Sequence, residues 1–448
     1  MSILVEKKSE LSFLGGDTLI EKPCSNIFTW PIVTKEHEES VLSVLRRGEM
    51  SGWDVTKEFE NQYARKLGRD YGLAYNNGTG AILGGLWAMG VKAGDEVIVP
   101  SLTYWASVLP LYSLGATPVF ADVEAETLCI DPQDIERKIT SRTKAIIVVH
   151  YAATPAKMDA ILEIARKHGL KVMEDCSHAH GALYKGKEVG TFGDTAAFSL
   201  MSGKSFAIGE GGILFTDDIE TYDRAILFGH YERHCDIETE ELKPYIGIPC
   251  GGFKHRMHQL SSAFGLVQLK LYPQQMAEID KAMNYFCDLL EEIPGLEPIR
   301  PEKDSGSTKG GWYASICKYN SDVFDGLSLS RFAAAVRAEG SICDPGCNKP
   351  LHLHPVFKTM DIYGQGRPTR VANLPAGLEV SEIQESLPVT EAVNKQVFFM
   401  PWFKHFWPET IQEFAAAYKK VAQNYKELLE GDAKTVEAGG FSSSFRKK

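Results

Sequence analysis

Residues 171–180 read KVMEDCSHAH, in which a short apolar run ends at two adjacent acids. The run has the length of a strand, and three similar runs rich in β-branched residues precede it. Helix-length segments such as 159–169, DAILEIARKHG, separate the runs. Because non-alternating strands joined by helices form parallel sheets covered on both faces, the pattern predicts one large α/β domain. The earlier runs are EVIVP at 96–100, TPVFAD at 117–122 and KAIIVVH at 144–150.

The two acids, Glu174 and Asp175, stand at the carboxyl end of this expected strand. Ligands bind at that end of open parallel sheets. A carboxylate held there can pair with a protonated ring nitrogen, which makes a pyridine cofactor a better electron sink. The alternative is that the acids, together with His178 and His180, only cap or pack the start of a loop.

The chain divides into four expected parts. Residues 1–27 look like an N-terminal arm, and residues 28–275 form the large α/β domain. From 276 to 431, helical stretches mix with short strands and Gly/Pro segments, which predicts a smaller C-terminal α+β domain. The last residues, 432–448, are rich in Gly, Ser and basic residues and are expected to be disordered.

Composition excludes several classes of protein. The 448 residues include 44% apolar residues, so a large core is expected and a mostly disordered chain is not. The net charge of −11 argues against nucleic acid and anionic membranes as partners. No apolar window is long enough to span a bilayer. The nine cysteines are scattered, which favours the reducing cytoplasm over a disulfide framework.

A glycine-rich turn, Asn77-Gly78-Thr79-Gly80, leads into an apolar helix. Unpaired backbone N–H groups and the helix dipole make such a start a possible phosphate cradle. The alternative is a plain glycine-rich helix start. The segment is not a dinucleotide fingerprint, because Leu83 stands where the last glycine belongs, and it is not a P-loop.

One lysine, Lys204, stands among small residues in the segment 199–205, SLMSGKS, just ahead of Gly209-Glu210-Gly211-Gly212. A lysine at a cleft, with neighbours small enough to leave room for a ring, is suited to imine chemistry. Its amine must be partly desolvated to act as a nucleophile near neutral pH. The alternative is a surface lysine in a glycine loop.

The order and spacing of these three signals resemble the DegT/DnrJ/StrS family of keto-sugar and cyclitol aminotransferases. The resemblance runs from about residue 51 to 268, and more loosely to about 425. It implies a fold-type I enzyme that depends on pyridoxal phosphate (PLP). The matching stretches include SGWDVTKEFENQYA, NNGTGAILGGL, GDEVIVPSLTYWAS, EDCSHAHGALYKG and GGFKHRMHQLSSAFGLVQL.

The resemblance also implies roles for single residues around the cofactor ring. Lys204 matches the lysine that forms the internal Schiff base with PLP and shuttles the proton. Asp175 matches the acid that pairs with the pyridinium nitrogen. Tyr104 matches the aromatic residue that stacks on the ring, and His178 matches a position near the ring oxygen.

A second set of positions matches the family's phosphate site. Gly78, Thr79 and Gly80 match the phosphate-binding helix start, and Ser199 matches a phosphate-binding hydroxyl. Lys254 matches the residue that reaches the phosphate from the neighbouring subunit, so the resemblance implies a homodimer with shared active sites.

Two departures and one competing site stand out. Ala153 occupies a position that is usually Gly in the family, so the loop around it is expected to be reshaped. The segment 355–395 is longer than expected and is a candidate for remodelling the substrate entrance. Four possible zinc ligands have spacing unlike that of common zinc sites, and no metal is expected. These are Cys343, Cys347, His352 and His354.

The expected reaction is a two-step, ping-pong amino transfer. Glutamate or glutamine gives its amino group to the cofactor, and a keto-sugar, nucleotide-linked in the expected case, or a keto-cyclitol accepts it. A dehydratase of the same family is an alternative, but those members carry histidine in place of Lys204. Two further candidates are a non-catalytic PLP-binding regulator and a nucleotide-dependent oxidoreductase, and the broken glycine fingerprint argues against the oxidoreductase.

Overall fold

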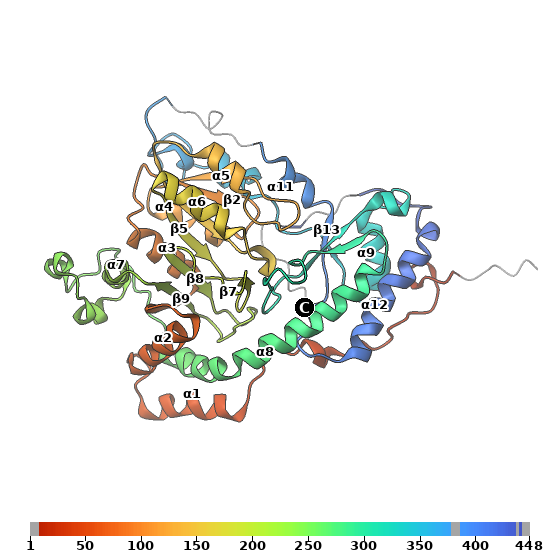
Figure 1. The fold of residues 1–448 in the computed structure, drawn as a ribbon, viewed down its shortest axis with the longest axis horizontal. Coiled ribbons are helices and arrows are strands. Elements are labelled where there is room, and N and C mark those ends of the chain that lie inside the picture. Colours follow the sequence, from red (N-terminus) through yellow and green to blue (C-terminus); the bar gives the residue numbers. More distant parts are fainter. Residues whose placement is uncertain (1–8, 378–385, 436–438, 441–448) are drawn as a thin grey trace, which may run out of the picture.

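The four apolar runs form neighbouring strands of a seven-stranded sheet in the computed structural model, which describes residues 9–377, 386–435 and 439–440 (Figure 1). The strand order is β1-β9-β8-β5-β4-β2-β3, and β9 runs antiparallel to both of its neighbours. The expected mostly parallel sheet is therefore confirmed. The strands are β1 (Tyr71–Tyr75), β2 (Glu96–Pro100), β3 (Thr117–Ala121), β4 (Thr143–Val149), β5 (Lys171–Asp175), β8 (Thr195–Ser199) and β9 (Gly212–Thr216).

Helices cover the sheet and continue into the C-terminal part. Those of the first part are α1 (Lys35–Arg47), α2 (Asp54–Leu67), α3 (Gly78–Ala88), α4 (Pro110–Ser113), α5 (Pro132–Lys138), α6 (Met158–His168), α7 (Ile219–Gly229) and α8 (Gln259–Glu291). Those that follow are α9 (Leu329–Ala338), α10 (Pro355–Lys358), α11 (Pro388–Val393) and α12 (Pro408–Gln423).

Both faces of the large sheet are buried, because side chains alternate between two apolar cores. Phe198 and Ile213 face a core shared with α2 and α8. Their neighbours Ala197 and Leu214 face a second core shared with α3 and α7. A sheet covered in this way does not need the apolar–polar alternation of a half-exposed sheet, which explains why the strands read as continuous apolar runs.

The C-terminal part holds a smaller antiparallel sheet in the order β10-β11-β13-β12, with α9 and α12 packed beside it. The expected boundary between residues 275 and 276 falls inside α8, one continuous helix that lies along both parts of the molecule (Figure 1). The strands are β10 (Leu296–Pro298), β11 (Ile316–Tyr319), β12 (Asp344–Pro345) and β13 (Val397–Phe399). A separate two-stranded hairpin pairs β6 (Leu183–Tyr184) with β7 (Lys187–Glu188).

The described part of the long segment 355–395 contacts the edge of the large sheet around Arg370. Thr117 on β3 donates to the Arg370 carbonyl at 2.9 Å, and Arg370 Nε donates to the Pro118 carbonyl at 3.0 Å. Covering an edge strand removes a template for unwanted pairing. None of the described residues of this segment lines the cavity presented below, and its role at the substrate entrance stays a prediction.

The described ends of the chain pack against the C-terminal part. In the expected N-terminal arm, Leu11 and Ile20 are buried, and Glu339 accepts hydrogen bonds from the N–H groups of Ser12 and Leu19. Within the expected tail, Asp432 accepts two hydrogen bonds from Ser328, and the Gly440 carbonyl accepts from the N–H of Lys349 at 2.9 Å. The rest of the tail beyond 432–435 and 439–440 lies outside the described residues. No helix in the described ranges is long and apolar enough to cross a membrane.

Candidate active site

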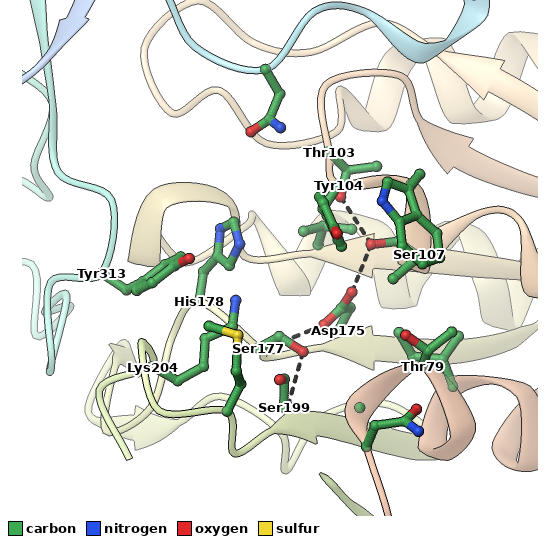
Figure 2. Close-up of a pocket in the computed structure, with 18 of the residues that line it drawn as sticks. Thr79, Thr103, Tyr104, Ser107, Asp175, Ser177, His178, Ser199, Lys204 and Tyr313 are labelled. Carbon is green, nitrogen blue, oxygen red and sulfur yellow. Dashed lines mark hydrogen bonds between the residues drawn. The ribbon is translucent and has the colours of Figure 1, made fainter. Parts of the chain in front are cut away.

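A cavity of about 240 Å³ lies where β4, β5 and β8 end and α3 begins (Figure 2). The strand ends contribute Val149, Asp175 and Ser199 to its lining. The start of α3 contributes Gly78 and Thr79. The cavity therefore opens at the carboxyl edge of the parallel strands, as expected for a ligand site in an open α/β sheet.

Lys204 lies in the loop that follows β8 and is 9% exposed. Its N–H donates to the Met201 carbonyl at 2.8 Å, and the Trp30 indole donates to the Lys204 carbonyl at 2.7 Å, which fixes the lysine backbone from both sides. The amine lies 4.1 Å from the centroid of the Tyr313 ring. Burial lowers the pKa of the amine to about 8, although the negative charge of Asp175 opposes that change. A substantial fraction is therefore neutral and nucleophilic near neutral pH.

Asp175 is buried at the end of β5 with a defined orientation. The Ser107 hydroxyl donates to Oδ2 at 2.7 Å, and the N–H of Ser177 donates to Oδ1 at 3.1 Å (Figure 2). Thr103 bonds Ser107 in turn at 2.9 Å. A carboxylate so held has lone pairs left for a positively charged group in the cavity.

The start of α3 fits a phosphate group. The Asn77 side chain accepts from the N–H of Gly80 at 2.7 Å, and no acceptor among the described residues engages the N–H groups of Gly78 and Thr79. A Cβ on Gly78 would lie 2.7 Å from the Cβ of Ser199, so glycine is required for this close approach. Two unpaired N–H groups at a helix start beside a serine hydroxyl form an anion site.

Two aromatic residues complete the expected ring site. Tyr104 lines the cavity beside Trp105, with 4.9 Å between the ring centroids. His178 lies 4.6 Å from the Tyr313 ring, and its Nδ1 is buried with no partner among the described residues. Burial and the nearby Lys204 amine lower the pKa of His178 well below its usual value, so the imidazole is neutral and its ring nitrogens can serve a bound polar atom.

The residues present fit PLP, since the cavity combines a buried amine, an oriented carboxylate and an anion site. Every expected site residue lines the cavity except Gly80 and Lys254. Gly80 shares the helix start, but its N–H is already used by the Asn77 cap. Lys254 is exposed, with its amine 5.9 Å from the Tyr231 ring, and contributes nothing to the cavity of its own subunit.

Several residues of the cavity wall were not expected from the sequence. Ser107 and Ser177 orient Asp175. Each is a polar residue within three positions of an expected site residue, and that proximity in the sequence could have indicated them. Tyr313 and Asn348 come from the C-terminal half of the chain. Neither belongs to a local motif, and only the tertiary fold brings them to Lys204.

The loop with Ala153 keeps a glycine-like backbone. Ala152 and Ala153 have φ values of 49° and 65°, in the left-handed region that favours glycine. Ala153 therefore takes a strained conformation that favours glycine, and the reshaping of this loop relative to the family stays a prediction. Strain of this kind is found near functional sites, and the ring of Tyr151, two residues before Ala153, lies 5.6 Å from the His178 ring.

The four candidate zinc ligands do not converge. Cys343 is buried in one apolar core and Cys347 in the other. His352 bonds the Ser101 hydroxyl at 2.7 Å, and His354 accepts a hydrogen bond at the start of α10. Their short spacing in the sequence therefore does not produce a common metal site.

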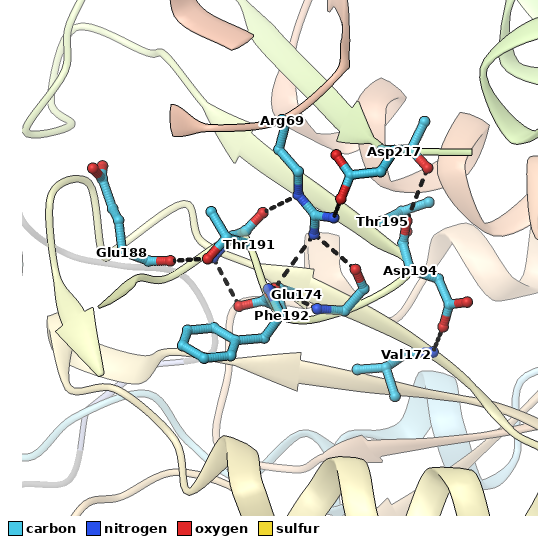
Figure 3. Close-up of polar contacts among 12 residues, drawn as sticks. Arg69, Val172, Glu174, Glu188, Thr191, Phe192, Asp194, Thr195 and Asp217 are labelled. Atoms are coloured by element: carbon cyan, nitrogen blue, oxygen red, sulfur yellow. Dashed lines mark hydrogen bonds and ion pairs between the residues drawn. The ribbon is translucent and has the colours of Figure 1, made fainter. Parts of the chain in front are cut away.

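A saturated polar network surrounds Glu174, next to the cavity (Figure 3). The N–H groups of Phe192 and Gly193 donate to Oε1, and the N–H of Gly190 donates to Oε2, each at 2.7 Å. His150 Nε2 lies 3.0 Å from Oε2. Arg69 binds the Gly190 and Gly193 carbonyls at 2.8 and 2.7 Å, which closes the loop around the carboxylate (Figure 3).

His150, Glu174 and Cys176 could in principle hold a metal ion, since their ligand atoms lie within 4.8 Å of one another. However, His150 Nδ1 already accepts from the N–H of Ala156 at 3.1 Å, which leaves the imidazole proton on Nε2. That proton points to Glu174, whose oxygens are fully used. The cluster is therefore a hydrogen-bonded structural core.

Comparisons with known proteins agree on one family. Residues 31–373 match the model of the DegT/DnrJ/EryC1/StrS aminotransferase family. The chain is 30% identical over 438 residues to the L-glutamine:scyllo-inosose aminotransferase of Streptomyces griseus, covering 94% of this chain and 99% of that protein. The aminotransferase from Psychrobacter cryohalolentis is similar with a TM-score of 0.76 and 28% identity, over 89% of this chain and 99% of that one.

A further solved structure is DesI in the presence of its TDP-sugar product. It gives a TM-score of 0.77 at 25% identity and covers 94% of this chain and 98% of that one. These structures confirm the expected fold-type I architecture.

Proposed function

Because this chain belongs to the DegT/DnrJ/EryC1/StrS family of PLP-dependent aminotransferases, we propose that it moves an amino group from glutamate or glutamine to a keto-cyclitol or keto-sugar. The observation that carries the proposal is the buried Lys204 amine in the same cavity as an oriented carboxylate and an anion site. Lys204 also favours an aminotransferase over the dehydratase alternative, in which histidine would replace it.

The side chains of the cavity divide the chemistry between them. When bound, PLP supplies an electron sink that stabilises negative charge on the substrate carbon. Lys204 acts as the nucleophile toward a carbonyl carbon, and its free amine takes up and returns a proton at Nζ. The Asp175 carboxylate holds a proton on the ring nitrogen, and the N–H groups of Gly78 and Thr79 with the Ser199 hydroxyl bind the phosphate.

A homodimer with shared sites is the working unit in this proposal. Lys254 is exposed and does not line the cavity of its own chain, so its amine is available to a partner. The segment around it extends away from the body of the molecule beyond α7 (Figure 1). Exposed apolar side chains gather there, which favours a protein interface over solvent. They are Tyr231, Tyr245, Ile246, Ile248 and Phe253.

We also propose a cytoplasmic location. All nine cysteines are free thiols, and six of them are buried. A chain with this many unpaired thiols is suited to a reducing compartment.

Borohydride reduction of the holoenzyme followed by peptide mapping tests the role of Lys204. The expected result is one pyridoxyl label, on Lys204. Lys309 is an internal control, because burial lowers its pKa to about 8 as well, but its amine donates to the Ile299 carbonyl and lies outside the cavity. A label on Lys309, or on any lysine other than Lys204, would contradict the proposal.

The substrates are tested in separate half-reactions. Glutamate or glutamine should convert the holoenzyme to its pyridoxamine form with loss of the visible band. A panel of keto-cyclitols and nucleotide-linked keto-sugars should then include an acceptor that restores the band. Parallel lines in double-reciprocal plots are expected for this ping-pong scheme, and intersecting lines would count against it.

A further inference from the structure

Asn348 lies in the loop between β12 and Leu351, is 6% exposed and lines the same cavity as Lys204. Both of its backbone polar groups are engaged. Its N–H donates to the Tyr151 hydroxyl at 3.2 Å, and its carbonyl accepts from Asn394 Nδ2 at 2.7 Å. The backbone at this position is therefore held from two sides by buried side chains.

The orientation of the Asn348 amide is also fixed. The Tyr151 hydroxyl donates to Oδ1 at 2.7 Å, while its oxygen accepts the N–H of Asn348. Because Oδ1 faces this donor, Nδ2 must be the opposite end of the amide. Nδ2 has no acceptor among the described residues, and it is open to the cavity. A donor that is held in one orientation and is open to the cavity is available to a ligand atom.

The charges around the cavity indicate what kind of atom Nδ2 meets. Lys204 is the one cationic side chain among the described lining residues, and its amine is committed to the cofactor. Glu210, which also lines the cavity, is an exposed carboxylate. A neutral donor in a cavity with no second cation among the described lining residues suits an uncharged oxygen better than a carboxylate or a phosphate.

We propose that Asn348 determines specificity for the amino acceptor, with Nδ2 donating a hydrogen bond to a hydroxyl or carbonyl oxygen of an uncharged, polyhydroxylated ring. The inference rests on the proposed function and adds the chemistry of the substrate. Trp105, which is 37% exposed and lines the cavity, offers an aromatic face to such a ring.

The two half-reactions of the holoenzyme separate this role from others. The first is measured with glutamine and glutamate, and the second with scyllo-inosose and with a nucleotide-linked 4-keto-sugar. If neither acceptor restores the visible band in the wild-type enzyme, the proposed function fails and the inference fails with it. If one does, the variants below test Asn348 alone.

Asn348→Ala should lower the specificity constant of the acceptor half-reaction by about 10- to 100-fold and leave the donor half-reaction within about threefold. Asn348→Asp should be at least as damaging to the acceptor half-reaction, since Oδ1 can still face Tyr151 while the donor becomes an acceptor. Tyr151→Phe should give a smaller loss in the same half-reaction, because the amide can then rotate. Leu353→Ala, at an exposed position of the 3-10 helix Leu351–Leu353 that follows Asn348, is the control.

Three results would overturn the inference. An unchanged acceptor half-reaction in Asn348→Ala would exclude the hydrogen bond. Equal losses in both half-reactions would indicate a structural role, and a larger loss with the donor would assign Nδ2 to the donor carboxylate. Acceptor analogues that lack one hydroxyl give a final check, because one of them should lose reactivity with the wild-type enzyme but not with Asn348→Ala.

Discussion

Glu174 and Asp175 are adjacent in the sequence, yet Glu174 is enclosed by hydrogen bonds from its own chain and Asp175 lines the cavity. Successive side chains of a strand point to opposite faces, so the two carboxylates at the end of β5 enter different surroundings. Glu174 is completely buried and receives three backbone N–H groups (Figure 3). His150 Nε2 donates to it as well. Asp175 receives one hydroxyl and one N–H and faces the cavity (Figure 2).

Glu174 and Asp175 differ in how many carboxylate lone pairs remain free of hydrogen bonds from their own chain. A carboxylate whose lone pairs are all taken by its own chain stabilises a loop, whereas one with lone pairs left at a cavity can serve a ligand. Burial alone would raise the pKa of Glu174, but the His150 and backbone hydrogen bonds outweigh it and lower that pKa. The acid is therefore ionised in the folded protein at neutral pH.

The largest expected effect is that of Asp175→Asn on catalysis. The amide keeps the shape of the side chain but removes the charge that we propose holds a proton on the cofactor ring. The rate constant of the donor half-reaction, measured by stopped-flow absorbance, should fall by at least about 100-fold. The melting temperature should stay close to that of the wild type. A variant that unfolds instead would place Asp175 in the same structural class as Glu174.

Glu174→Gln should have the opposite profile. The amide NH₂ would face backbone N–H donors or Arg69, which should reduce the free energy of unfolding by about 2–4 kcal/mol at pH 7. Because the folded-state pKa is lowered, the contribution of ionised Glu174 is full above its unfolded pKa of about 4.3 and is lost as the pH falls through the folded value. Urea unfolding at neutral and acid pH measures this difference, with Glu163→Gln on the exposed face of α6 as control.

The pH dependence of cofactor uptake sharpens the comparison. With the Lys204 pKa at about 8, the rate at which the apoenzyme forms its visible band with PLP should rise about tenfold between pH 7 and 9. Asp175 raises that pKa, so Asp175→Asn should move the midpoint to lower pH. Glu174→Gln should leave the midpoint unchanged, and a shift in that variant would show that the two acids are not electrostatically separate.

The smallest expected effect is in the loop after β4, next to β5. Ala153→Gly should stabilise the protein by about 0.5–1 kcal/mol, because glycine adopts the left-handed conformation without strain. The greater loss of backbone entropy of glycine on folding offsets part of this gain. Chemical denaturation measures the change. Ala160→Gly on α6 is the matched control and should destabilise by a similar amount, since glycine is unfavourable within a helix. Destabilisation by both variants would show that Ala153 is not strained.

Much of the large sheet could be predicted from the sequence. The runs EVIVP, TPVFAD, KAIIVVH and KVMEDC became β2, β3, β4 and β5 because local apolar length and β-branching determine buried parallel strands. The boundary of the C-terminal part could not be predicted, because α8 passes through residue 275 without interruption. The cover of β3 by the segment around Arg370 was also missed, since it depends on contacts between residues about 250 positions apart.

In the site, too, residues in local sequence patterns could be predicted, and residues placed by long-range contacts could not. Gly78, Asp175 and Lys204 stand in local patterns that indicate an anion cradle, a strand end and a nucleophile. Tyr313 and Asn348 carry no such pattern, because their place in the wall depends on how the C-terminal part folds back on the sheet. The sequence also could not tell Glu174 from Asp175, since the difference lies in which N–H groups surround each carboxylate.

The hydrogen bond from the Trp30 indole to the Lys204 carbonyl joins residues 174 positions apart. Two further residues of the cavity wall, Tyr313 and Asn348, are synthesised after Lys204. Tyr313 and Asn348 leave the ribosome more than a hundred residues after Lys204. A nascent chain that has just exposed its reactive lysine therefore has neither the aromatic cover nor the oriented amide of the finished cavity. The complete wall thus requires synthesis as far as Asn348, and a chain truncated before Tyr313 would present Lys204 to solvent without that cover.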